Sequence, residues 1–176
     1  MQKTLVILAH PNLEKSIGNK IITDIIGQED NIEIRHLDAL YPNFKIDIQA
    51  EQDALMGVET IVFQYPLYWY STPGILKEWI DQVIQYGFAF GHESILNDKQ
   101  IIASVTVGSP QEQYPQDVVD NILFPIRGLA KYCDFVYKGD VLSFSINNYS
   151  PEAGEQAIKN AQEHAAKLIA LINSWF

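Results

Sequence analysis

A segment near the amino end of the chain combines residue types that bind anions. Residues 9–19 read Ala-His-Pro-Asn-Leu-Glu-Lys-Ser-Ile-Gly-Asn, between an apolar run and a helical pattern. The first turn of a helix has free backbone N–H groups and a partial positive charge, so it is a ready phosphate site. Ser16 and Asn19 could add side-chain donors, and His10 could reach the same anion. The structural alternatives are a plain N-cap at Ser16 and a loop histidine at His10.

Two further segments have the composition of a site for a flat ligand. Residues 64–73 place Tyr68, Trp69 and Tyr70 in a row between two prolines, ahead of a helical pattern. Large aromatic side chains in such a loop suit the face of an aromatic ligand, although a hydrophobic lid or a subunit contact would also use them. Residues 106–110 contain Gly108, where the backbone can approach a ligand closely. This last signal is weak by itself.

Several other kinds of site lack their motifs. The chain contains neither a Walker lysine pattern nor G-x-G-x-x-G, so ATP and a Rossmann-bound dinucleotide receive no support. G-x-S-x-G is absent too, and no spacing of His, Cys and carboxylates suggests a cluster, so we expect neither a serine hydrolase nor a metal site.

The elements that must position these segments alternate between strand and helix along the whole chain. Short apolar or alternating runs predict strands over residues 5–8, 32–36, 60–64, 101–107 and 135–144. Apolar residues at helical spacing predict helices over 16–26, 50–56, 73–84, 118–131 and 152–176, with a disturbance at Pro125.

Five strands that alternate with helices predict an α/β fold, a parallel sheet with helices on both faces. The leading strand order is 2-1-3-4-5, the flavodoxin-like order, in one domain over residues 1–176. In that order the chain reverses its direction of winding between the first and third strands, and ligands bind beyond the carboxyl ends of the strands there. The loops after Ala9, Gln64 and Val107 should therefore meet at one place.

Bulk composition limits the partners and the compartment. The 176 residues have a formal net charge of −10, which disfavours nucleic acid and an anionic membrane surface as direct partners. The single cysteine, Cys133, excludes an internal disulfide, and the first apolar run is shorter than a signal-peptide core. These features favour a cytoplasmic protein.

The same three segments carry a resemblance to a known family. The motifs are His10-Pro11 with Ser16 and Asn19, residues 66–79 (Pro-Leu-Tyr-Trp through Leu-Lys-Glu-Trp), and residues 87–91 (Gly-Phe-Ala-Phe-Gly). Together they resemble the NAD(P)H:quinone oxidoreductases, and the likeness extends through residues 123–126. Residues 40–47 and the short length look closest to the compact bacterial branch, which includes ancillary reductases of glutathione-gated potassium efflux systems.

The resemblance implies a bound flavin, FMN in so short a chain, with FAD as the alternative. It places the flavin phosphate among His10, Ser16, Ile17, Gly18 and Asn19. It places the flavin ring against Pro66, Leu67, Tyr68, Trp69, Tyr70, Thr106, Val107, Gly108 and Ser109.

The resemblance also implies an enzyme activity and an assembly. NAD(P)H would reduce the flavin by hydride transfer, and a quinone would then take both electrons at the same place, which is a ping-pong mechanism. Members usually form homodimers, so Phe88 and Phe90 of one subunit would line the substrate site of the other. Tyr114 corresponds to a tyrosine that contacts substrate, but no histidine lies between Gly108 and Phe124, where the family has one.

Other functions share this fold. A one-electron flavodoxin carrier normally has a phosphate loop rich in Thr and Gly, unlike residues 11–15, and a phosphoacceptor receiver needs aspartates at the strand ends. A regulatory flavoprotein that binds and activates a membrane transporter stays open beside the enzyme, because one protein can do both.

Overall fold

The five predicted strands form one parallel sheet in the computed structural model, which describes residues 2–174. The strands are β1 (Thr4–Leu8), β2 (Ile32–His36), β3 (Thr60–Pro66), β4 (Gln100–Thr106) and β5 (Val136–Ser143). Their order is β2-β1-β3-β4-β5, and every neighbouring pair is parallel. The predicted flavodoxin-like order is therefore confirmed.

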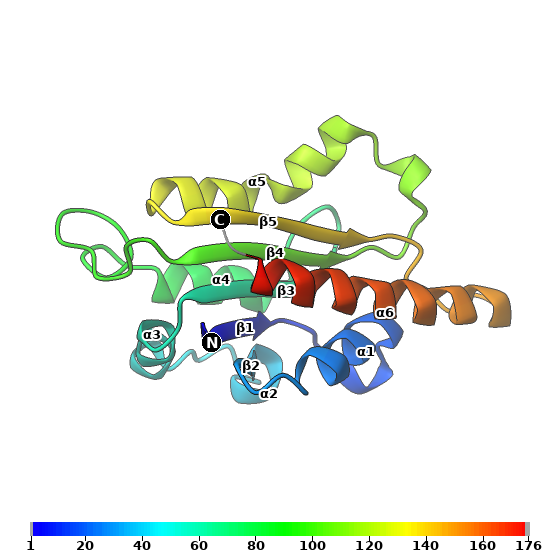
Figure 1. The fold of residues 1–176 in the computed structure, drawn as a ribbon, viewed down its shortest axis with the longest axis horizontal. Helices are drawn as coiled ribbons and strands as arrows, with labels where there is room; N and C mark the ends of the chain where they lie inside the picture. The colour runs from blue at the N-terminus through cyan, green and yellow to red at the C-terminus, as the bar shows by residue number, and fades with distance from the viewer. Residues whose placement is uncertain (1, 175–176) are drawn as a thin grey trace.

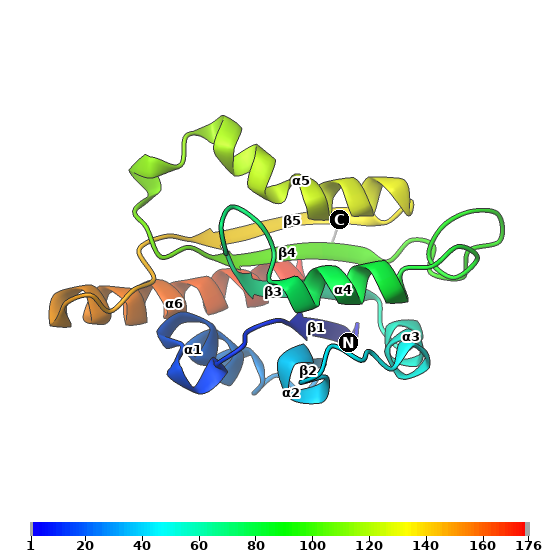
Figure 2. The ribbon, with the colours of Figure 1, turned by 180° about the vertical axis from the view of Figure 1, so that it is seen from behind.

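Helices cover both faces of this sheet. They are α1 (Ile17–Ile26), α2 (Leu37–Leu40), α3 (Ile48–Met56), α4 (Gly74–Val83), α5 (Gln116–Tyr132) and α6 (Pro151–Asn173). Figure 1 shows α1 and α6 next to each other in front of the sheet, and Figure 2 shows α4 on the opposite face. None of the described helices is long and apolar enough to cross a membrane.

Each face of the sheet has its own apolar core, because side chains alternate along each strand. Val62 of β3 and Ile102 of β4 pack under α1 and α6 with Leu168. Phe63 belongs to the larger core on the other face, where its ring meets that of Trp79 of α4 edge-on, with 6.0 Å between centroids. The α1/α6 core becomes polar toward the carboxyl ends of the strands, at buried residues Gln64, Ser104 and Thr106.

The structure refines several predicted bounds. The one-turn helix α2 was not predicted, α3 begins two residues earlier, and β3 continues to Pro66. Helix α5 continues through Pro125 and changes direction along its length in Figure 1, as expected where a proline removes a backbone donor. Helix α6 ends at Asn173, and the predicted end of this helix at residues 175–176 lies outside the described residues.

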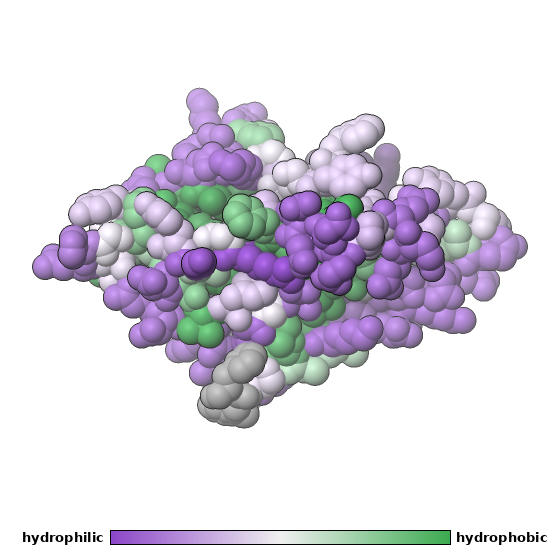
Figure 3. All heavy atoms as spheres, turned by 90° about the horizontal axis from the view of Figure 1, so that it is seen from above, coloured by the Kyte–Doolittle hydropathy of each residue, from purple (hydrophilic) through white to green (hydrophobic). Residues whose placement is uncertain are grey.

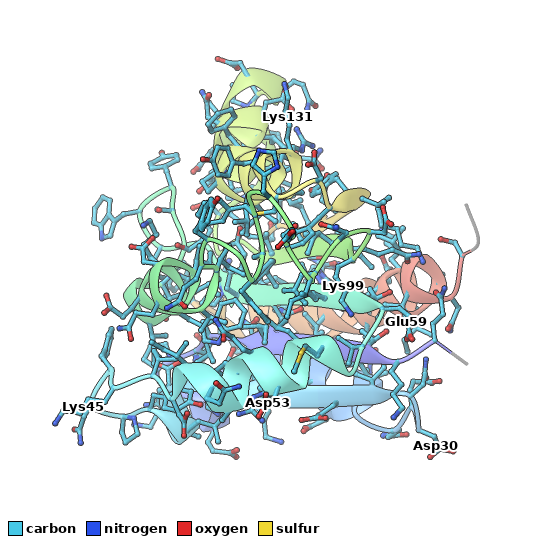
Figure 4. The ribbon with its side chains drawn as sticks, turned by 90° about the vertical axis from the view of Figure 1, so that its left-hand side faces the viewer. Asp30, Lys45, Asp53, Glu59, Lys99 and Lys131 are labelled. Atoms are coloured by element: carbon cyan, nitrogen blue, oxygen red, sulfur yellow. The ribbon has the colours of Figure 1, made fainter. Side chains whose placement is uncertain are left out.

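The two edges of the sheet at the strand ends differ in composition. Figure 4 faces the amino-end edge, where the labelled Glu59 and Lys99 lie close together. Glu59 accepts the backbone N–H of Lys3 at 2.6 Å, and the Lys99 ammonium donates to the carbonyl of Val58. The loop between β3 and α4 follows the opposite, carboxyl-end edge and rises in front of β4 and β5 in Figure 2. The aromatic and anion-binding segments belong to that carboxyl-end edge.

Candidate functional site

A cavity of about 280 Å³ lies at the carboxyl ends of β1, β3 and β4. Its lining residues that were predicted from sequence are His10, Ser16, Ile17, Gly18, Asn19, Pro66, Leu67, Tyr68, Thr106 and Gly108. Its remaining lining residues are Lys15, Ile146, Asn147 and Asn148. The structure therefore brings the three predicted loops to one cavity.

Four predicted cofactor residues do not line this cavity. Val107 is buried in the core of the other face, and Ser109 accepts the backbone N–H of Ser145 through its carbonyl. Trp69 and Tyr70 lie at the tip of the second loop, and Trp69 is 94% exposed. These positions border the cavity in sequence without forming its wall.

Helix α1 begins at the cavity with an ordinary cap. The Ser16 hydroxyl accepts the backbone N–H of Asn19 at 3.1 Å, so the structural alternative for Ser16 is observed. The hydroxyl proton of Ser16 is still available to a ligand, since the cap uses only a lone pair. Ile17 and Gly18 have backbone N–H groups in the first turn, where a helix supplies no internal acceptor. Lys15 adds a positive charge at the same end.

His10 faces this anion-binding turn in its neutral form. Its Nδ1 accepts the backbone N–H of Asn12 at 3.1 Å, which leaves Nε2 to hold the ring proton. Burial lowers the pKa of the His10 imidazole from its ordinary value, while the nearby Asp38 opposes the shift and His36 adds to it. Asp38 also accepts the backbone N–H of His10 at 2.7 Å. The ring can therefore donate one hydrogen bond to an anion in the cavity.

The side chain of Asn19 already has hydrogen-bond partners within the protein. Its amide nitrogen donates to the Thr106 hydroxyl at 2.9 Å, and its amide oxygen accepts from Gln64 at 2.6 Å. The residue is only 1% exposed. Asn19 therefore contributes to the cavity through a buried contact with Thr106 rather than as a separate donor on the surface.

The second loop contains a strained turn. Tyr68 and Ser71 exchange two backbone hydrogen bonds of 3.0 Å, and the two residues between them, Trp69 and Tyr70, have φ angles of 49° and 62°. Two-residue turns of this kind normally use Asn-Gly, because a Cβ in the left-handed region costs about 1–2 kcal/mol per residue. Bulky aromatics retained at such positions point to a function for their side chains.

Tyr114 lies in a row of rings beside this turn. Its ring centroid is 6.0 Å from that of Tyr70 and 5.5 Å from that of Phe144. It follows the 3₁₀ turn η2 (Gln111–Gln113) and is half-buried. The structure therefore places the predicted substrate-contacting tyrosine next to the aromatic turn, although Tyr114 does not line the cavity itself.

Phe88 and Phe90, the predicted substrate-lining residues, differ in exposure within the single chain. Phe88 is 7% exposed and packs in the core of its own chain, because the following loop folds back so that Ile95 and Leu96 donate to its carbonyl. Phe90 is half-buried, with its ring 5.3 Å from that of Tyr132. Phe90 therefore keeps part of its ring at the surface, whereas Phe88 has little exposed surface in the single chain.

The segment from Ile146 to Asn148 was missed because it has no helical or strand periodicity. It runs between the first and third loops, where the Ile146 amide donates to the carbonyl of Val107 at 2.9 Å. A Cβ at Gly18 would overlap the Ile146 side chain, which is why a glycine stands there. Asn147 donates to the carbonyl of Gly108 at 2.8 Å. Within residues 2–174 no group of three His, Cys, Asp or Glu side chains forms a metal site.

Sequence comparisons agree with this architecture. A family model described as flavodoxin-like fold matches residues 2–169. A Bacillus subtilis protein named uncharacterized NAD(P)H oxidoreductase YrkL is 43% identical over 136 residues, 74% of this chain and 78% of that protein. KefF of an Enterobacter species, named as an ancillary protein of a glutathione-regulated potassium-efflux system, is 41% identical over 73% of this chain and 76% of its own length.

Solved structures give the same result. General stress protein 14 of Treponema denticola, solved in complex with FMN, superposes with a TM-score of 0.87 at 34% identity, covering 96% of this chain and 99% of that one. An NADPH-quinone reductase from P. pentosaceus superposes with a TM-score of 0.76 at 25% identity, covering 93% and 97%. The chain therefore belongs to the flavodoxin-like family and, within it, to the oxidoreductases of the NAD(P)H:quinone oxidoreductase type.

Proposed function

We propose that this protein is an FMN-dependent enzyme that transfers hydride from NAD(P)H to a quinone with ping-pong kinetics. The observation that carries the proposal is one cavity lined both by the anion-binding start of α1 and by Pro66, Leu67 and Tyr68, which lead into the aromatic turn. The first feature suits a phosphate and the second suits a flat ring, and a flavin mononucleotide has both. The FMN named in the Treponema denticola complex supports this choice over FAD.

Residues of α1 would hold the phosphate. The donors are the Ser16 hydroxyl, the first-turn N–H groups of Ile17 and Gly18, the Nε2–H of His10 and the ammonium of Lys15. This set fits a doubly charged phosphate monoester, because charge-assisted hydrogen bonds to a helix N-terminus are stronger than neutral ones.

The remaining loops would hold the ring system. Pro66, Leu67 and Tyr68 form an apolar wall of the cavity, and Gly108 lets the backbone of the third loop come close. FMN, when bound, supplies the hydride-accepting and hydride-donating chemistry that no side chain has. The backbone amides of Trp69 and Tyr70 take no part in the pair of bonds that closes the turn. They would therefore be oriented donors toward the ring edge.

Tyr114 would act on the substrate side of the ring. The Tyr114 ring lies between those of Tyr70 and Phe144. A substrate bound over the aromatic turn would therefore be close to the Tyr114 hydroxyl. We expect Tyr114→Phe to slow turnover about tenfold, about 1.4 kcal/mol, if the hydroxyl assists the transition state. Stopped-flow reduction by NAD(P)H measures the effect, with Tyr149→Phe as the control for an exposed tyrosine. An unchanged rate for Tyr114→Phe would remove this residue from the reaction.

The activity is tested on protein reconstituted with FMN. NADH or NADPH and a simple benzoquinone are varied together, and the ligand released by heating is identified by mass. We expect parallel lines in double-reciprocal plots, since two substrates that use one place in turn cannot be bound together. Intersecting lines, or no quinone-dependent oxidation of NAD(P)H, would contradict the proposal and favour the one-electron carrier.

A second candidate function has its own observation. The identity of 41% to a potassium-efflux ancillary protein supports a regulatory role, in which this chain binds a membrane transporter at its cytoplasmic side. Co-purification of the FMN-loaded protein with such a transporter from the same organism tests this role. The outcome is independent of the quinone assay.

We further propose a cytoplasmic homodimer. NAD(P)H is a cytoplasmic reductant, and the one cysteine, Cys133, is buried and unpaired. The support for a dimer is an aromatic face, formed by Tyr86, Phe90, Phe124, Gly128 and Tyr132, that remains open on the single chain. Figure 3 looks down on the edge that α5 covers and shows green apolar atoms among the purple polar ones there.

A further inference from the structure

His164 is a buried titratable residue with no place in the proposed chemistry. It lies on α6, is 0% exposed, and is bonded at both ring nitrogens. Nδ1 is 2.9 Å from the hydroxyl oxygen of Ser143 in β5, and Nε2 is 2.6 Å from the hydroxyl oxygen of Ser104 in β4. Burial lowers the pKa of His164 to about 3, and Lys167 adds to the shift, so the ring is neutral near pH 7. One nitrogen therefore donates and the other accepts.

The hydrogen bonds continue from Ser104 to the cavity. The Ser104 hydroxyl donates to the amide oxygen of Gln64, whose amide nitrogen donates to Asn19 at 2.6 Å. The Asn19 amide nitrogen then donates to the hydroxyl oxygen of Thr106 at 2.9 Å. Thr106 lines the cavity, whereas Gln64 and Ser104 are completely buried. Six side chains thus form one continuous path from half-buried Ser143 of β5, through His164 of α6, to the cavity.

The bonds along this path all have the same direction. Ser104 has one hydroxyl proton and gives it to Gln64, so the proton between Ser104 and His164 must belong to Nε2 of the imidazole. The neutral ring then accepts at Nδ1 from the Ser143 hydroxyl. At the other end, the Thr106 hydroxyl accepts from Asn19, and its own proton has no partner inside the path. Because Thr106 lines the cavity, we expect this proton to be available to a ligand there.

The surroundings make this direction costly to disturb. The path crosses the α1/α6 core, where Val62, Ile102 and Leu168 exclude water. A buried polar atom that loses its partner there cannot be satisfied by solvent. Hydrogen bonds in an apolar setting also polarise one another, so aligned donors strengthen the last one.

We propose that His164 is a positioning residue that fixes Thr106 as a hydrogen-bond donor to an acceptor oxygen of the ligand in the cavity. The inference rests on the proposed flavin site, where phosphate and polyol oxygens offer such acceptors. A reversed path would turn the Thr106 hydroxyl into a donor toward Asn19 and leave only its lone pairs for the ligand. The tautomer of His164 therefore determines whether Thr106 donates a hydrogen bond to the ligand or accepts one from it.

The first test needs no ligand. In protein labelled with ¹⁵N-histidine, the ring nitrogen shifts of His164 report which nitrogen holds the proton. We expect the neutral Nε2–H tautomer from pH 5 to pH 8, with and without FMN. A neutral Nδ1–H tautomer would reverse the path and overturn the proposal.

The second test is a double-mutant cycle on FMN affinity, measured by quenching of flavin fluorescence. Thr106→Val removes the terminal hydroxyl and should weaken FMN binding about tenfold. His164→Leu should weaken it about fivefold in the wild-type background and less than twofold in the Thr106→Val background, because it acts through Thr106. His164→Gln keeps a donor toward Ser104 and should stay within about twofold of wild type. If the losses of FMN affinity in His164→Leu and Thr106→Val are additive, or if His164→Gln binds FMN as weakly as His164→Leu, then His164 has only a packing role.

A further pair of variants covers the case in which His164→Leu does not fold. Ser143→Ala removes the donor to Nδ1 at the far end of the path, while Ser145→Ala removes a nearby hydroxyl outside it. Ser143→Ala removes the hydrogen bond that orients the ring at Nδ1 and should weaken FMN binding two- to threefold. The Nε2–H tautomer should persist, because Ser104 still needs that proton. Ser145→Ala should leave FMN affinity unchanged. A changed tautomer with unchanged affinity would overturn the proposal. If the wild-type protein binds no FMN at all, the proposed function fails, and the tautomer still decides the direction of the path.

Discussion

Individual residues at the site stabilise the local structure and also keep groups that can bind a ligand. Ser16 caps α1 with a lone pair and keeps a proton for a ligand, and His10 accepts a backbone N–H at one ring nitrogen and can donate from the other. Trp69 and Tyr70 are held in a conformation that their side chains disfavour. Such residues cannot be assigned to structure or to function alone, so their roles must be separated by experiments that measure both.

Ser16→Ala separates the cap from the ligand contact. The lost cap should lower the free energy of unfolding by about 1 kcal/mol, and the lost hydroxyl donor should weaken FMN binding about five- to tenfold. Urea denaturation measures the first effect and a fluorescence titration measures the second. Asp47→Ala removes the corresponding cap of α3, away from the cavity, and should reproduce only the stability loss. Equal FMN affinities of both variants would exclude Ser16 from the phosphate site.

His164 gives a second residue-scale prediction, on pH. The pKa of His164 is about 3 in the folded chain and about 6.5 when unfolded, so below pH 6.5 only the unfolded state takes up this proton. The free energy of unfolding should therefore fall by up to about 1.4 kcal/mol for each pH unit between 6.5 and 4.5. His164→Gln should show a flatter decline over the same range in urea denaturation. Parallel curves for the two proteins would mean that His164 does not have the lowered pKa.

Secondary-structure elements were more predictable than the details of their ends. Strand and helix periodicity gave the sheet order and the meeting of three loops, because parallel strands bring their carboxyl ends to one edge. The one-turn helix α2 is too short to show periodicity. The wall at residues 146–148 and the burial of Phe88 depend on how loops fold back, for which neither segment has a local signal.

Buried polar contacts between secondary-structure elements could not be predicted from sequence patterns either. Glu51 of α3 is 0% exposed and joins three other elements or loops. It accepts from the Arg35 guanidinium of β2 at 2.6 Å, from the Tyr41 hydroxyl and from the Trp79 indole of α4 at 2.9 Å. In the sequence Glu51 has the position of an ordinary helix-surface glutamate.

Glu51→Gln should therefore destabilise the packing of α3 without affecting the site. The amide removes the buried counter-charge of Arg35 and leaves only an exposed carboxylate near the guanidinium, so we expect a loss of about 3 kcal/mol in the free energy of unfolding. Glu33→Gln removes the exposed carboxylate 3.7 Å from the same guanidinium and should change stability by less than about 0.5 kcal/mol. Urea denaturation compares the two variants. A small loss for Glu51→Gln would mean that its hydrogen bonds, and not its charge, hold the elements together.

At the scale of the whole molecule, surface chemistry is unevenly distributed. The net charge of −10 favours solubility and disfavours contact with anionic surfaces. The aromatic face departs from this pattern: the Tyr86 ring lies 5.9 Å from that of Phe90, and the Phe124 ring covers Gly128. Phe124, Gly128 and Tyr132 are four residues apart in turn, so they lie on one side of α5.

The aromatic face predicts the oligomeric state. Phe124 and Tyr132 are 70% and 72% exposed, and large apolar groups left open in this way favour association. We expect a dimer at micromolar concentration in analytical ultracentrifugation and a monomer for Phe124→Asp, whose carboxylate cannot be buried without a partner. Ile158→Asp places the same charge at an exposed apolar position of α6, away from the aromatic face, and should remain dimeric. If each subunit completes the substrate site of the other, quinone reduction should fall together with the dimer in Phe124→Asp and stay unchanged in Ile158→Asp. A wild-type monomer with full activity would refute both the dimer and the shared site.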